Sequence, residues 1–192
     1  MNAVALIRRL HEHRSWVNQK LLSASGSLSD DQLRQPFPIG QGSIWKSLLH
    51  MYAAEYVWLE ALRGNAHPLV PGDQPDKLPG NQQAEGGMAS LAELAANWGD
   101  LNRRWEDYLD ALAPESLGQR VVKKSTSSGR GKTHSTSRAD VLLHVCTHAQ
   151  YTTAQVVNML RQVAADSLPD VMLITLAREE SISGADLGNN HE

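Results

Sequence analysis

The stretch from residue 88 to 112 is the feature that most constrains how this chain can fold. Its large apolar residues recur at alternating steps of three and four. They are Leu91, Leu94, Trp98, Leu101, Trp105, Tyr108 and Leu112. That spacing places apolar side chains on one face of an α-helix and is typical of the seam between helices of a bundle. It predicts a long helix that packs against others.

Three more helices are expected on similar grounds. The first covers about residues 3–24, the second follows Ser43 and ends near residue 63, and the fourth covers about 137–164. Ser43 and Ser137 are suitable N-cap residues because a serine hydroxyl can accept a hydrogen bond from a free N–H of the first turn. The second helix is apolar nearly all round, so we expect it to be buried among its neighbours. These features predict an all-α four-helix bundle.

The length of 192 residues, with 41% hydrophobic and 20% charged residues, is that of one globular domain. We expect a single helical domain over residues 1–180 and a disordered tail over 181–192. Residues 65–87 contain four prolines and predict a long loop, which is unusual in a compact domain. Residues 169–180 predict a short helical segment that returns over the bundle.

Charge and cysteine content limit the partners and the compartment. The formal net charge is -3, which favours neither nucleic acid nor a membrane surface. The N-terminal residues are polar and no 18-residue apolar run exists, so we expect no signal peptide and no membrane span. Cys146 is the single cysteine and cannot form an internal disulfide. These observations predict a cytoplasmic protein.

A basic segment runs from residue 120 to 138, with six Lys or Arg and no acidic residue. Val121 and Val122 predict a short strand within it. The segment fits a solvated loop, and it also fits an anion-attracting lid near the mouth of a site. No aromatic residue interleaves with these charges, so bases would find no stacking platform and we expect no nucleic-acid partner.

Three of the eight histidines are placed where they could share a metal ion. His144 and His148 are four residues apart in the fourth helix, so their side chains lie on one face. His50 lies in the middle of the most apolar helix, where a polar ring needs a partner. Neutral imidazoles from facing helices are a usual way for a bundle to hold zinc. The remaining histidines are expected at the surface. They are His11, His13, His67, His134 and His191.

A second interpretation is that these histidines are ordinary hydrogen-bonded groups in the core or in a groove. Glu55 lies about 140° around the second helix from His50, so we expect it to pair with an Arg or Lys rather than with a metal. Cys146 lies between His144 and His148 in sequence but on another face, and we expect it to be a small core residue.

Three segments together resemble the DinB/YfiT-like family of metal-dependent four-helix bundles, over about residues 4–178. They are LIRRLHEHRSWVNQKLL, GSIWKSLLHMYAAEYVWLEALRG and ADVLLHVCTHAQYTTAQVVNMLRQ. The resemblance implies an up-down-down-up bundle, a homodimer, and a site for zinc or nickel made by one histidine of the second helix and two of the fourth. His50 and His148 match two of these ligands. The third falls on Thr152, and a hydroxyl is a poor ligand for zinc or nickel.

Three arrangements remain open for the third ligand: His144 supplies it, Thr152 holds a water molecule that does so, or the site is degenerate. We favour His144 because its spacing from His148 is ideal. The resemblance then implies a metal-dependent hydrolase or a thiol transferase that acts on a small molecule or a thiol between the second and fourth helices. The alternative is a non-catalytic ligand-binding or dimerising bundle with a degenerate metal site.

Overall fold

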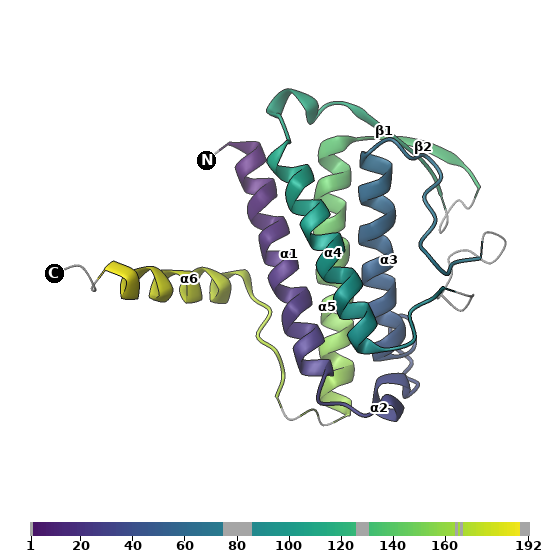
Figure 1. Cartoon of the computed structure of the whole chain (residues 1–192), viewed down its shortest axis with the longest axis vertical. Helices are drawn as coiled ribbons and strands as arrows, with labels where there is room; N and C mark the ends of the chain where they lie inside the picture. Colours follow the sequence, from purple (N-terminus) through teal and green to yellow (C-terminus); the bar gives the residue numbers. More distant parts are fainter. Residues whose placement is uncertain (1, 75–85, 126–130, 164, 166, 189–192) are drawn as a thin grey trace.

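A computed structural model describes residues 2–74, 86–125, 131–163, 165 and 167–188 of the chain. Four long helices lie side by side and form a bundle (Figure 1). They are α1 (Ala3–Ser25), α3 (Ile44–Leu62), α4 (Leu91–Asp110) and α5 (Arg138–Gln162). The helical class and the four-helix bundle predicted from the sequence are confirmed.

The order of helix directions is up-down-down-up. Figure 1 shows α1 and α5 running one way and α3 and α4 running the other. Because α3 and α4 are consecutive and parallel, the chain between them must travel back along the bundle. The long connection expected over 65–87 serves this purpose, although residues 75–85 lie outside the described part of the chain. α5 packs between α1 and α3, and α4 closes the other side.

Each long helix begins at a polar N-cap residue whose side chain accepts a hydrogen bond from the first turn. Ser43 accepts from the N–H of Lys46, and Ser137 accepts from the N–H of Asp140. A short helix, α2 (Asp30–Arg34), begins with a complete capping box formed by Ser29 and Gln32. The helix starts predicted at Ser43 and Ser137 are therefore confirmed.

The core lies where the seam of α4 meets the other helices. Leu94, Trp98, Leu101 and Trp105 are each at most 3% exposed. Burial of apolar surface of this extent is the main source of stability for a bundle. The seam recognised in the sequence is thus the part of α4 that faces the core.

A small antiparallel hairpin crosses one end of the bundle. Its strands are β1 (Arg120–Lys124) and β2 (Thr133–Ser137), preceded by a 3-10 turn at Pro114–Ser116. β1 contacts both α3 and α5. The strand predicted at Val121 and Val122 is confirmed, so the basic segment is ordered structure in its described parts rather than one solvated loop.

The C-terminal helical segment predicted from the sequence is confirmed as α6 (Leu173–Gly188), which contacts α1 and projects from the side of the bundle (Figure 1). Polar contacts hold it: Glu180 pairs with Arg9 at 2.7 Å, and Glu179 accepts a hydrogen bond from Trp16 at 3.1 Å. Ile174 and Ile182 are 55% and 66% exposed, so much of its apolar surface does not reach the core. The homodimer that the family resemblance implies stays a prediction.

The α6 helix continues past residue 180, where we expected the domain to end, and residues 189–192 lie outside the described part. The domain boundary itself stays a prediction. Within the described residues, none of the helices combines the length and apolar character needed to cross a membrane.

Candidate metal site

Two histidines meet at the centre of the contact between α3 and α5. The Nε2 atoms of His50 and His148 are 3.0 Å apart, and the ring centroids are 4.9 Å apart. Because α3 and α5 are antiparallel, Trp58, which follows His50 on α3, faces His144, which precedes His148 on α5. Their rings are 5.3 Å apart. The two helices therefore place these aromatic side chains in one continuous row.

The surroundings keep these histidines neutral. Burial lowers the pKa of His50. Burial, with smaller contributions from His50 and His144, lowers the pKa of His148 to about 4. Burial and then the Lys123 ammonium lower the pKa of His144. A neutral imidazole has a free lone pair on one nitrogen, which is the form that binds a metal ion.

His144 is close to this pair but does not join it. Its ring centroid is 5.7 Å from that of His148, and its ring makes an edge contact with Trp58. Thr152 is 2% exposed, and its hydroxyl donates to the backbone oxygen of His148 at 3.1 Å. In the described ranges, no group of three His, Cys, Asp or Glu side chains is placed to hold one ion. The structure thus brings two of the three expected ligands together and leaves the third beside them.

The His50 and His148 pair nevertheless fits a divalent ion. Two nitrogens bound at 2.0–2.1 Å to a tetrahedral zinc are roughly 3.3 Å apart. The observed Nε2 separation of 3.0 Å is close to that value. Both rings are partly exposed, so further positions on an ion are open to water or to His144.

His11 and His13, expected at the surface, are only 2% and 6% exposed, and that prediction is wrong. The Nε2 of His11 lies 3.1 Å from the backbone oxygen of Leu142 in α5, and the Nε2 of His13 lies 2.9 Å from that of Val171. The two rings point away from each other, as their spacing predicts. Both are nevertheless covered, His11 by α5 and His13 by the segment that contains Val171. The sequence did contain a signal, because the apolar pattern of α1 has a gap at His11 and Arg14.

A buried charged network occupies that gap. Arg14 Nη1 lies 3.2 Å from a carboxylate oxygen of Glu55, and both side chains are at most 3% exposed. Asn18 and Trp98 donate hydrogen bonds to the same carboxylate at 2.8 and 3.0 Å. The expected pairing of Glu55 with a basic residue is confirmed. Cys146 is also buried as expected, and burial raises the pKa of its thiol to about 12.

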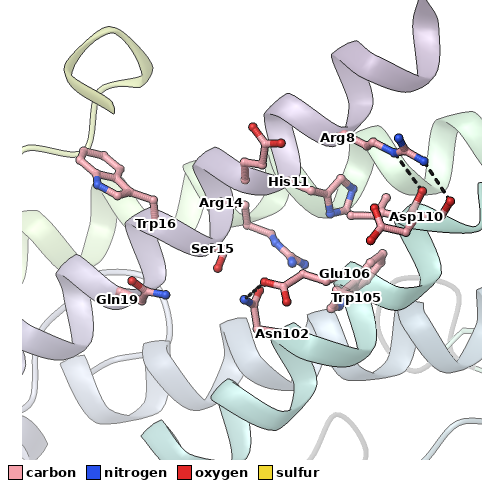
Figure 2. Close-up of a pocket in the computed structure, with 12 residues that line it drawn as sticks. Arg8, His11, Arg14, Ser15, Trp16, Gln19, Asn102, Trp105, Glu106 and Asp110 are labelled. Atoms are coloured by element: carbon pink, nitrogen blue, oxygen red, sulfur yellow. Dashed lines mark hydrogen bonds between the residues drawn. The ribbon is translucent and has the colours of Figure 1, made fainter. Parts of the chain in front are cut away.

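A pocket of about 430 Å³ lies between α1 and α4 (Figure 2). All its lining residues come from these two helices, including His11, Arg14 and Trp105. The pocket is therefore separate from the histidine pair on α3 and α5. Trp105 is fully buried and contacts both the His11 ring and the Arg14 guanidinium, each 4.8 Å from it, so this wall belongs to the packed core.

His11 makes the stability of the metal-free protein depend on pH. Burial, followed by the nearby Arg14 charge, holds the pKa of His11 well below 6.5 in the folded state. The unfolded chain therefore binds the proton more readily, so stability is full above about pH 6.5 and falls as the pH decreases below it. We expect urea unfolding in EDTA to show a loss of stability between pH 7 and pH 5. His11→Gln, which can still donate to Leu142, should reduce that dependence without abolishing it, because His50, His144 and His148 also have lowered pKa values, and an unchanged slope would contradict this role.

Comparison with known proteins agrees with this architecture. The model of the DinB superfamily matches residues 13–168. A conserved protein from Enterococcus faecalis superimposes with a TM-score of 0.62 at 15% identity, over 85% of this chain and 98% of the other.

YfiT from Bacillus subtilis, described as a probable metal-dependent hydrolase with an unusual four-helix bundle topology, superimposes with a TM-score of 0.60 at 15% identity, over 85% of this chain and 90% of its own. At this identity the likeness shows the fold alone. None of the curated protein sequences matches. Because the superfamily model covers most of the chain, this protein belongs to the DinB superfamily.

Proposed function

We propose that this protein binds one divalent metal ion between α3 and α5, with His50 and His148 as ligands and His144 as the third. The observation that carries the proposal is the 3.0 Å approach of two Nε2 atoms from different helices. Without a metal, one neutral imidazole can donate an Nε2–H hydrogen bond to the other across this distance, and loss of that proton leaves two lone pairs that can bind one cation. Zinc and nickel suit such nitrogen ligands.

The activity that best fits such a site is that of a metal-dependent hydrolase or thiol transferase. When bound, a divalent ion supplies Lewis-acid chemistry that activates water or a thiol as a nucleophile at neutral pH. His50 and His148 hold the ion, and their partial exposure admits a small molecule. The description of YfiT as a probable metal-dependent hydrolase supports the first activity. The resemblance of the sequence to a family that includes thiol-dependent enzymes supports the second.

A metal-dependent shift in melting temperature tests the proposal. A ligand that binds only the folded state stabilises it by about 2.7 kcal/mol when its free concentration is 100 times its Kd. We expect zinc or nickel to raise the Tm of protein stripped with EDTA by several degrees, and we expect renewed EDTA to reverse the shift. His67→Ala is a suitable control, because His67 is exposed in a loop and its loss should leave the shift intact.

The second candidate is a bundle that binds a ligand or dimerises without a metal. Thr152 favours it, because its hydroxyl donates to the helix backbone and Thr152 stands where the family has a third histidine. If neither zinc nor nickel changes the Tm, this second function replaces the first.

A further inference from the structure

Lys123 lies at the far end of a row of side chains that begins at the pair of His50 and His148. It lies on β1, and its Nζ is 5.0 Å from the centre of the Trp58 ring. Trp58 contacts His144, and His144 contacts His148. Since β1 packs on both α3 and α5, the hairpin places an ammonium group at one end of the row whose other end is the proposed metal site.

This ammonium group is buried without a counter-ion. Lys123 is only 7% exposed, and no ion pair in the described part of the chain includes it. An ammonium has three N–H donors, yet the one hydrogen bond recorded for it is a 3.4 Å contact with the backbone oxygen of Lys124. Two groups that interact with it, the Trp58 ring and the neutral His144, carry no negative charge.

Burying a cation without an anion is costly, and burial does lower the pKa of Lys123. Contact with the face of Trp58 offsets part of that cost, because the ring face carries partial negative charge. Two of the three donors still have no recorded acceptor within the described residues. The described part of the surrounding segment adds positive charge, since it contains Arg120, Lys124, Lys132 and Arg138 and no acidic residue. The local electrostatic potential therefore favours binding of a negatively charged ligand.

We propose that Lys123 binds the oxyanion group, a carboxylate or a phosphate, of the small molecule that this site acts on. This inference rests on the proposed function, because the metal site would hold the reacting end of the same molecule. Lys123 then selects acidic substrates over neutral ones of similar shape. A charge-assisted hydrogen bond to a buried ammonium supplies such discrimination.

Binding of two simple anions tests the proposal. Inorganic phosphate and succinate are titrated by calorimetry into zinc-incubated protein, into Lys123→Met and into Lys124→Met. Methionine keeps an unbranched apolar chain on Trp58 and removes the charge with its N–H donors, while Lys124 is the exposed neighbour on the same strand. We expect Lys123→Met to weaken binding of at least one anion about tenfold or more, and Lys124→Met to change it less than about twofold. The anion whose binding Lys123→Met weakens shows whether the oxyanion group is a phosphate or a carboxylate.

Equal binding by wild type and Lys123→Met overturns the proposal, and so does the absence of binding of either anion to the wild type. The zinc content of each sample separates this result from the fate of the metal site. If Lys123→Met loses anion binding but retains zinc, both proposals stand. If the wild type binds an anion through Lys123 but takes up no zinc, the anion site stands and the proposed metal-dependent function fails.

Discussion

Glu55→Ala is expected to lower the free energy of unfolding by about 3–5 kcal/mol, because it leaves the charge of Arg14 buried without its partner. Asn18 and Trp98 lose their acceptor in the same step, which adds to the cost. Urea unfolding followed by circular dichroism measures the change. The network lies between α1, α3 and α4, so its loss weakens three of the four long helices together.

Glu60→Ala provides the matched control. Glu60 is on the same helix and pairs with Arg104 of α4, but both side chains are more than 20% exposed. Pairs near the surface contribute about 0–1 kcal/mol, so we expect a small effect. A loss below about 1 kcal/mol for Glu55→Ala, equal to that of the control, would show that water enters the network and screens the charge.

His148→Ala is expected to reduce the affinity for zinc or nickel by more than about 100-fold, because the loss of a partner that merely orients a ligand already costs 10–100-fold. His148 contacts both His50 and His144, so its removal separates the other two candidate ligands. Competition with a chromophoric chelator measures the affinity.

His144→Ala, assayed in the same way, decides whether His144 is the third ligand. A large loss assigns it that role. An affinity equal to that of the wild type would mean that water completes the shell of a two-histidine site. If His148→Ala itself retained the wild-type affinity, the metal would bind elsewhere in the chain.

Much of the fold could be predicted because its determinants are local. The steps of three and four in α4 and the serine caps of α3 and α5 depend on residues close together in sequence. The order of helix directions came from the resemblance to the family rather than from periodicity. The direction of α6 could not be predicted, since it depends on which polar residues of α1 meet Glu179 and Glu180.

The candidate site was predictable in part for a similar reason. A lone His50 in an apolar helix indicates a partner, and the spacing of His144 and His148 indicates a shared face. The burial of Lys123 could not be predicted, and that of His11 was indicated only by the polar gap in α1, because the groups that cover both side chains are distant in sequence. His11 contacts α5 through Leu142, and Lys123 lies over Trp58 of α3. The sequence shows only that the apolar pattern of α1 is interrupted at Arg14. The structure supplies the reason, which is that Glu55 of α3 pairs with Arg14 there.

The metal content of protein purified without a metal-affinity tag tests the central claim most directly. Elemental mass spectrometry of the wild type, after incubation with zinc or nickel and removal of the excess, is compared with that of His50→Ala. We predict close to one ion per chain in the wild type and almost none in the variant. A wild type without metal, or a variant that retains as much metal as the wild type, would contradict a metal site at His50 and His148.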